Sequence, residues 1–465
     1  MQHRNLAFIV IALQAGCGRA RPVPAGETLP SELGPPPAAI ISLNAVYATN
    51  GGLLSPVGPD GVPMTSGGAT DPLLAEAERF YDAVQAPPTL DEWKAAFQFP
   101  ARAAGEDRQV YRDRANVAVY YNRNELGLGR QLGCSRFVDG HRADGSPVEG
   151  IACYVTNHGA GFRQGQAALQ AAIDDTHVRN TVSIAYRPSL GAGYEVQFYV
   201  YGSDGRRQDW ARLDTQGPRP HPQVCMTCHG GGYDSARHLA RNARFLPLDP
   251  GIVMFADAAG APAGVTRAGQ EERIRTFNAM ALETNLTDAQ RDLVAALYPD
   301  GAQKAGATAT GDGAPPEWRT NDADRDFYRS VVKPYCGTCH LAAQKALGDA
   351  DLWSYAAFRS PGAFDAAPLN TYVCTTFSMP NAQPTSLGFW DTLAGPVSVG
   401  GVSYPAAADA FLARRGLTRG SCPNLDMVTG CDHGSAPDAV CGGAVEGGAV
   451  CDLDSNRCVP VTPPG

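Results

Sequence analysis

The chain has 465 residues, of which 44% are apolar, and its formal net charge is −9. This length allows two to four domains with ordinary hydrophobic cores. The acidic balance and the lack of a Lys/Arg run exclude a typical nucleic-acid binder, which needs a basic face to release counterions from phosphates. No apolar stretch approaches the about 18 residues that a membrane-spanning helix needs.

Residues 1–17 have the pattern of an export signal, with a short basic start, an apolar core (LAFIVIAL) and small residues before Cys17. The pattern resembles bacterial lipoprotein signals, in which the cysteine is lipidated and begins the mature chain. Gln14 departs from the aliphatic residue usual at its position. The resemblance implies an exported protein, periplasmic or anchored in the outer membrane through a lipid on Cys17. Cleavage elsewhere, with a Cys17 that pairs with another cysteine, is the alternative.

Residues 18–70 are rich in Gly, Pro, Ala and Ser, which favours a flexible tether or a loosely packed start of the first domain. Residues 71–218 predict an α+β domain without haem, built on a mainly antiparallel sheet. Thr89 and Glu92 form a capping box before a helix, and a second helix is expected at 164–175.

Strands are predicted where apolar residues alternate along the chain, around 117–121, 182–186 and 194–200, with the last two forming a hairpin. We expect Cys134 and Cys153 to bridge neighbouring segments of this domain. The stretch 127–130 (GLGR) is too short for a dinucleotide-binding loop and is interpreted as a turn. The domain shows no catalytic constellation.

A five-residue motif, C-x-x-C-H, occurs twice. The first copy places Cys225 and Cys228 before His229, and the second places Cys336 and Cys339 before His340. In this spacing two thiols one helical turn apart can add to the vinyl groups of one haem while the imidazole reaches its iron, as in c-type haem attachment. The alternative is a zinc site with four thiolate ligands, which does not require either histidine.

The region after the first domain divides around these motifs. A first haem region covers 219–300 and is predicted to contain helices at 267–283 and 286–298, and residues 301–322 have the composition of a linker. A second haem region covers 323–421, with a first helix at 324–332 and a closing helix at 406–415. The tail at 422–465 has five cysteines and little apolar bulk, so it depends on crosslinks for its shape.

An electron-transfer haem needs a second axial ligand, and a thioether raises its reduction potential relative to a second imidazole. For the second haem this ligand is Met379, on a proline-containing loop 40 residues after Cys339. A core methionine is the alternative. For the first haem the preferred candidate for the second axial ligand is Met254, and the other candidates are His238, Met280 and His158. The alternative is an open coordination position.

Residues 323–421 resemble a small single-haem cytochrome c domain, with Cys336 and Cys339 as attachments and His340 and Met379 as axial ligands. In that family helices at the two ends cross near the haem. Cys374 and Cys422 of this chain flank the methionine loop and the closing helix, and a disulfide between them would clamp the loop on the iron. The stretch 75–421 resembles exported dihaem c-type cytochrome lipoproteins. Apart from the motifs, the supporting strings (NELG at 124–127 and ACYV at 152–155) are much less specific.

The 13 cysteines fit this scheme, because one lipidated and four haem-bound residues leave an even number for disulfides. These eight are Cys134, Cys153, Cys374, Cys422, Cys431, Cys441, Cys451 and Cys458. The last four resemble small cysteine-rich repeats of secreted proteins, for which two disulfides are expected and a metal cluster is the alternative.

The sequence therefore predicts an electron carrier with two covalent haems and iron as its metal, which exchanges electrons with redox proteins at the cell surface or in the periplasm. One alternative is an enzyme, a dihaem peroxidase-like oxidoreductase whose first haem keeps an open site. Another is a surface interaction or sensing protein, based on the domain without haem and on the tail. Carbon monoxide binding tests for an open haem site, and deletion of the tail tests whether the tail takes part in electron transfer. Together they distinguish the three hypotheses.

Overall fold

The structure is a computed structural model. It describes residues 72–123, 125–211, 219–257 and 260–342, and the short stretches 361, 385, 389, 398–399, 402–403, 449–452 and 457–460. The predictions on the signal, the tether, Cys17, Met379, Cys374, Cys422, Cys431, Cys441 and the helix at 406–415 lie outside these residues. For Cys451 and Cys458 only the backbone is described, in β12 (Ala449–Asp452) and β13 (Arg457–Pro460), where the two cysteines lie opposite each other.

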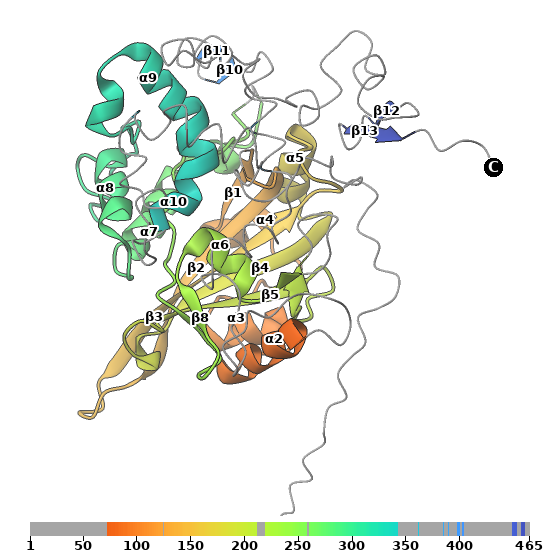
Figure 1. Cartoon of the computed structure of the whole chain (residues 1–465), viewed down its shortest axis with the longest axis vertical. Coiled ribbons are helices and arrows are strands. Elements are labelled where there is room, and N and C mark those ends of the chain that lie inside the picture. Colours follow the sequence, from red (N-terminus) through yellow and green to blue (C-terminus); the bar gives the residue numbers. More distant parts are fainter. Residues whose placement is uncertain are drawn as a thin grey trace, which may run out of the picture.

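A five-stranded antiparallel sheet forms the centre of the described part (Figure 1). Its strands are β1 (Ala118–Asn122), β2 (Leu128–His141), β3 (Pro147–His158), β4 (Val178–Tyr186) and β5 (Val196–Gly202). Their spatial order equals their order in the chain, and every neighbouring pair is antiparallel. The predicted antiparallel sheet and the β4–β5 hairpin are therefore confirmed.

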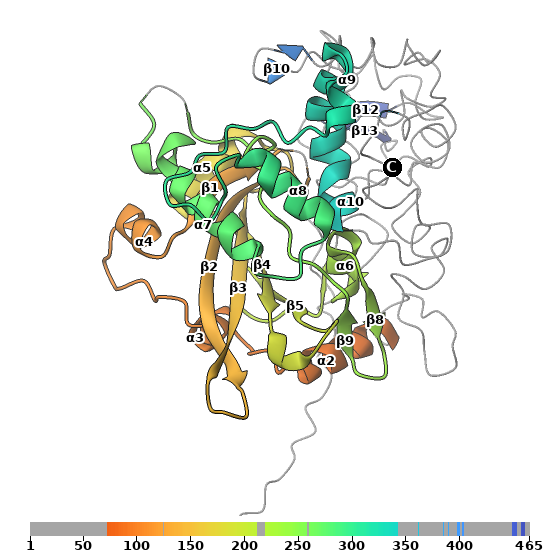
Figure 2. The same ribbon diagram turned by 90° about the vertical axis from the view of Figure 1, so that its left-hand side faces the viewer.

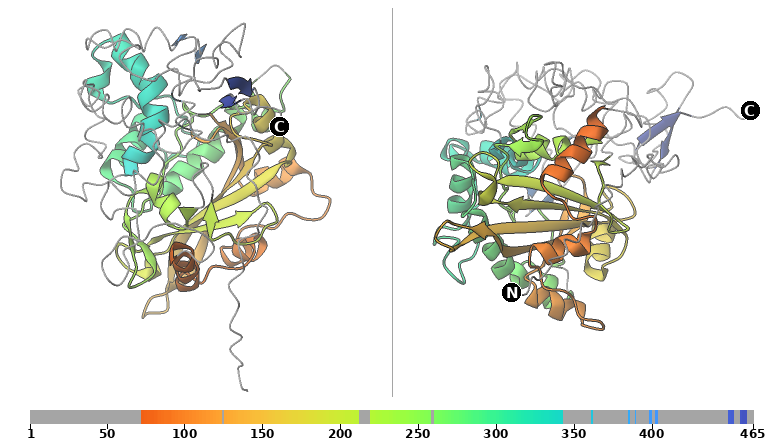
Figure 3. Two further views of the ribbon diagram at one scale, coloured as in Figure 1. Left: turned by 45° about the vertical axis from the view of Figure 1, so that its right-hand side comes forward. Right: turned by 90° about the horizontal axis from the view of Figure 1, so that it is seen from below.

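Both faces of the sheet are covered, by different helices. Trp93 of α3 (Leu90–Ala96) packs its ring against Tyr199 on one face, and α5 (Gln166–Asp174) contacts β1 and β2 there. Phe198, one residue along β5, faces the other side and contacts the His229 ring on α6 (Gln223–His229). Seen along the sheet, α6 and α3 lie on opposite sides (Figure 3). Alternation along each strand thus assigns side chains to two separate layers.

Of the described helices before the sheet, α3 begins at the predicted signal, whereas the other two were not predicted. Besides α3 they are α2 (Pro72–Ala83) and α4 (Arg108–Arg114). The Thr89 hydroxyl accepts a hydrogen bond from the Glu92 amide, and the Glu92 carboxylate accepts one from the Thr89 amide, so the expected capping box is present. The second predicted helix is α5, with its ends at Gln166 and Asp174.

The helices after the sheet include both that were predicted in the first haem region. These are α7 (Glu271–Ala281) and α8 (Asp288–Leu297), and α8 begins with its own capping box at Thr287. They lie in front of the sheet in Figure 2. A continuous helical stretch follows as α9 (Asp322–Phe327), the π-helical η5 (Tyr328–Gly337) and α10 (Thr338–Ala342).

The remaining described elements are short. They are β6 (Trp210–Ala211), β7 (Arg219–Pro220), β8 (Gly232–Asp234), β9 (Leu239–Arg241), β10 (Ser398–Val399), β11 (Val402–Ser403), η1 (Pro188–Leu190), η2 (Ala263–Val265), η3 (Ala268–Gln270) and η4 (Pro316–Arg319). The overall class is thus α+β. Between α8 and α9, Ala302 and Ala307 are buried against α8, and Trp318 is fully buried.

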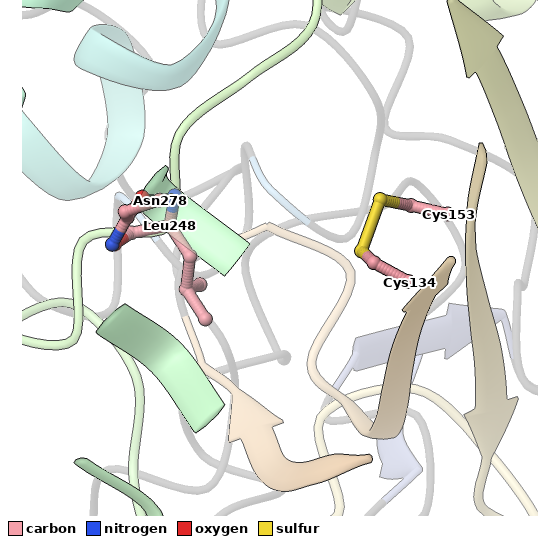
Figure 4. Close-up of a disulfide and its surroundings, with 4 residues drawn as sticks. All are labelled: Cys134, Cys153, Leu248 and Asn278. Atoms are coloured by element: carbon pink, nitrogen blue, oxygen red, sulfur yellow. Dashed lines mark hydrogen bonds between the residues drawn. A yellow bond between two sulfur atoms is a disulfide. The ribbon is translucent and has the colours of Figure 1, made fainter. Parts of the chain in front are cut away.

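A disulfide joins Cys134 on β2 to Cys153 on β3, directly opposite each other in the strand register (Figure 4). This confirms the predicted pairing.

A pair of hydrogen bonds fastens the segment 245–248 to α7, and Figure 4 shows Asn278 of α7 beside Leu248. The Asn278 side chain accepts a hydrogen bond from the Leu248 amide and donates one to its carbonyl, each at 2.9 Å, and thereby fixes the segment 245–248 to α7.

One hydrophobic core connects the sheet to the region that contains the first motif. Met226 of the first motif and Phe198 of β5 belong to the same buried cluster as Phe245 and Phe277. Because the core is shared, the first motif is held against the sheet by apolar packing rather than by the chain connection alone.

Candidate functional site

The two C-x-x-C-H motifs meet in space. The Sγ atom of Cys339 lies 3.2 Å from the Sγ atom of Cys228, although 111 residues separate them in the chain. Their helices, α6 and α10, are in contact, as Figure 2 shows. The sequence predicted each motif but not this proximity.

In the first motif the short helix α6 places both thiols and the imidazole on adjacent turns. His229 Nδ1 lies 2.8 Å from the Arg244 carbonyl oxygen, which only accepts, so Nδ1 carries the proton and donates. Burial lowers the pKa of His229, although the Arg244 carbonyl opposes this shift. The neutral imidazole, with Nδ1 anchored by a backbone carbonyl, is the form in which histidines ligate metals through Nε2.

In the second motif Cys336 lies in the last turn of η5, and His340 lies on α10, where it is buried. Burial raises the pKa of Cys336 to about 12. The hydrogen bond with Cys228 and then burial raise the pKa of Cys339 well above its ordinary value. Burial likewise raises the pKa of Cys225 to about 12. Without a bound metal, burial thus favours the neutral thiol at Cys225 and Cys336, and the hydrogen bond with Cys228 does so at Cys339.

A cavity of about 690 Å³ opens between the motifs and the sheet. Cys225, Cys228 and His229 line it from the first motif, and Cys339 lines it from the second. Sites that hold cofactors and small ligands typically have volumes of roughly 300–1,000 Å³. The segment 245–248 forms one wall, so the Asn278 side chain that fixes this segment also supports the cavity.

The face of the sheet below the cavity is largely apolar. Leu132, Val155, Val182 and Val200 stand opposite one another on four adjacent strands, and all four line the cavity. The His229 ring meets Phe198 at the edge of this surface, with ring centres 5.1 Å apart. The cavity thus combines an apolar row of strand residues with an anchored imidazole.

A buried ion pair joins the two motif regions. Lys333 Nζ, on η5, lies 2.7 Å from an Asp249 carboxylate oxygen, and the two side chains are 7% and 4% exposed. Lys333 also donates to the Asp312 carbonyl at 2.9 Å. Because Asp249 directly follows the wall 245–248, the pair positions the second motif relative to the first.

The sequence-derived candidates for the distal ligand of the first haem lie elsewhere. Met254 pairs through its backbone with Tyr121 at the edge of β1. His238 Nδ1 bonds Glu76 at 2.6 Å, and His158 is fully buried in β3 with Nδ1 donating to Thr176. Met280 packs beside the main core. None of the four lines the cavity, whereas His177 and His221 do.

The sequence analysis missed the polar residues of the cavity, above all Arg130. The interpretation of 127–130 as a turn is wrong beyond Gly127, because Leu128 to Arg130 are the first residues of β2. Gly129 is required there by packing, since a Cβ atom would overlap the Ala168 carbonyl of α5. The pairing of Arg130 with Asn157 across the strands could be found only once the register was known.

No family model matches this chain, and neither a curated protein nor a solved structure is detectably similar to it. Among the described residues, no group of three or more His, Cys, Asp and Glu side chains is arranged to hold a metal ion. None of the described helices has both the length and the apolar character needed to cross a membrane.

Proposed function

We propose that the chain binds two haems covalently and transfers electrons between redox partners outside the cytoplasm. Cys225 and Cys228 would attach the first haem and Cys336 and Cys339 the second. His229 and His340 would be the proximal iron ligands. The observation that carries the proposal is the meeting of both motifs at one cavity, with the Cys228 and Cys339 sulfurs in contact.

The residues around the first motif fit such a group. A haem is a flat, mostly apolar ring, and the cavity offers an apolar row of strand residues and an imidazole with Nδ1 already anchored. When bound, the haems would supply one-electron chemistry, and the chain would set their potential through axial ligands, burial and hydrogen bonds.

The remaining parts of the proposal are based on the sequence predictions. Met379 would complete the iron site of the second haem, in a helical domain similar to a small cytochrome c over 323–421. Cys17 would carry the lipid that anchors the protein to a membrane, with the periplasm or the outer membrane as its location. The remaining cysteines of the tail would form disulfides in that oxidising compartment.

The test is haem quantitation on protein exported from cells that mature c-type cytochromes. We expect two covalently bound haems per chain, determined from the pyridine haemochrome spectrum and from the intact mass after denaturation. Protein from cells without haem-attachment enzymes is the matched control and should carry none. A colourless protein loaded with zinc would contradict the proposal.

A second candidate function is supported by the position of the distal ligand candidates. Met254, His238, Met280 and His158 all lie outside the cavity, so the first iron would keep a position for an exogenous ligand opposite His229 unless His177 or His221, which line the cavity, occupies it. This is the arrangement that a peroxidase-like oxidoreductase requires.

Carbon monoxide distinguishes the two functions, because it binds ferrous haem only at an open or easily vacated position. For the electron carrier we expect no change in the reduced spectrum on adding the gas. Binding at one haem per chain, lost together with the first motif in Cys225→Ala/Cys228→Ala, would favour the peroxidase-like function instead.

A further inference from the structure

The floor of the cavity changes from apolar to polar along the strands. Next to the apolar row Leu132, Val155, Val182 and Val200 lies a polar row, two residues further along each strand. In the strand register Tyr120 faces Arg130, Arg130 faces Asn157, and Asn157 faces Asn180. All four line the cavity. Since residues two apart on a strand point to the same face, both rows belong to one continuous surface.

The polar row is a connected network. Arg130 Nε donates to Asn157 Oδ1 at 3.1 Å, and Asn157 Nδ2 donates to Asn180 Oδ1 at 2.7 Å. Arg130 Nη1 also lies 2.9 Å from a Glu125 carboxylate oxygen. A guanidinium has five N–H donors, more than Asn157, Glu125 and Tyr120 take, so Arg130 retains capacity for a further acceptor.

The charge of the cavity is positive at this end. The formally charged residues that line it are Glu125, Arg130 and Arg179, which gives one excess positive charge. Burial disfavours the charged guanidinium of Arg130, but Glu125 and Tyr120 more than offset this, so its pKa lies above the ordinary value. The side chain is 13% exposed, and a charge in such a place interacts strongly with an approaching anion.

The imidazole end and the polar row are separated along the strands. Phe198, against which His229 packs, lies one row beyond the apolar row, opposite Ile184. The polar row is therefore four residues along the strands from the imidazole end, roughly 13 Å at the usual rise per residue. A haem likewise has an apolar part and a polar part, with iron at the centre of an apolar ring and two carboxylates on one edge.

We propose that Arg130, Asn157 and Asn180, together with Arg179, bind the carboxylate edge of the haem that is attached at the first motif. This inference rests on the proposed function. Arg130 would donate its remaining N–H groups to one carboxylate, and the amides would contact the edge beside it, together with Arg179, which also donates to the Ala160 carbonyl. The row thus orients the ring on the sheet and sets its reduction potential.

Arg130→Gln removes the charge and most of the donors. We expect covalent haem to remain, the carboxylate bending band of the first haem to shift in resonance Raman spectra, and its potential to fall, because a nearby cation favours the reduced haem. A tenfold change in the ratio of oxidised to reduced haem at fixed potential corresponds to about 59 mV for one electron. Arg130→Lys should recover most of the potential but not the band position.

The matched control is Arg136→Gln, since Arg136 projects from the same face of β2 and pairs with Glu283 away from the cavity. If Arg130→Gln folds poorly, Arg179→Gln provides the second test, with a change in the same direction. Both measurements are repeated in Cys336→Ala/Cys339→Ala, which keeps only the first haem.

The outcomes separate the two proposals. Wild-type protein without covalent haem overturns the proposed function before any variant is compared. Covalent haem with the band and the potential unchanged in Arg130→Gln and Arg179→Gln overturns the carboxylate site. Changes that vanish when the second haem is absent also overturn it, because they assign these residues to the carboxylates of the second haem.

Discussion

Replacing Cys225 and Cys228 together by alanine is expected to lower the covalent haem content from two per chain to one. Each thioether bond needs one of these sulfurs, and His229 alone holds a ring only by coordination, which denaturation breaks. Cys336→Ala/Cys339→Ala should likewise leave one haem, and replacing all four should leave none. The measurement is haem staining after denaturing electrophoresis, combined with intact mass.

The controls change the residues between the thiols. Thr227→Ser and Thr338→Ser preserve both cysteines and the histidine of their motif, so both should retain two haems. If the variant that lacks all four of these cysteines still carried covalent haem, the haem would be attached elsewhere in the chain. Zinc release in proportion to the cysteines removed would instead support the alternative site with four thiolates.

The local signals in the sequence predicted β1, β4 and β5 but not β2 and β3, the two longest strands of the sheet. The alternation at 182–186 and 194–200 identified β4 and β5, because one face of each strand meets helices and the other meets the cavity. The capping box at Thr89 marked the start of α3, since it satisfies amides that the helix itself leaves unpaired. Such signals act over a few residues and can be recognised without tertiary structure.

The candidate site could be predicted only in part, because it depends on contacts between distant residues. The motifs identified the thiols and imidazoles, but the contact of Cys228 with Cys339 depends on how η5 and α10 dock. That docking is fixed by Lys333 and Asp249, and by the Thr287 hydroxyl, which donates to the Leu341 carbonyl at 2.8 Å. None of these pairs has a sequence signature, since each partner is an ordinary polar residue taken alone.

The buried ion pair also predicts a large effect on stability. Lys333→Met removes the charge that compensates Asp249, whose side chain is only 4% exposed. Breaking a buried pair by removing one partner typically costs about 3–5 kcal/mol, because the remaining charge stays out of water without compensation. We expect a loss of this size in the free energy of unfolding, measured by denaturant titration with circular dichroism.

Two further variants isolate the cause. Lys333→Met combined with Asp249→Asn removes both charges, while the amide oxygen can still accept the hydrogen bond that Gly251 donates to Asp249 at 2.7 Å. This double variant should recover most of the lost stability. The control is Arg206→Met, which breaks a pair with Asp204 whose side chains are 62% and 64% exposed, and should cost about 0–1 kcal/mol.

The same pair couples stability to the site, because Lys333 lies three residues before Cys336. If the ion pair positions the second motif, Lys333→Met should lower the fraction of chains that carry two haems, and the double variant should restore it. If the loss of stability in Lys333→Met persisted fully in the double variant, this account would be contradicted. The cost would then come from the lost packing of the lysine side chain or from its lost hydrogen bond to the Asp312 carbonyl. Equal haem content in all three proteins would separate the folding role of the pair from the placement of the motifs.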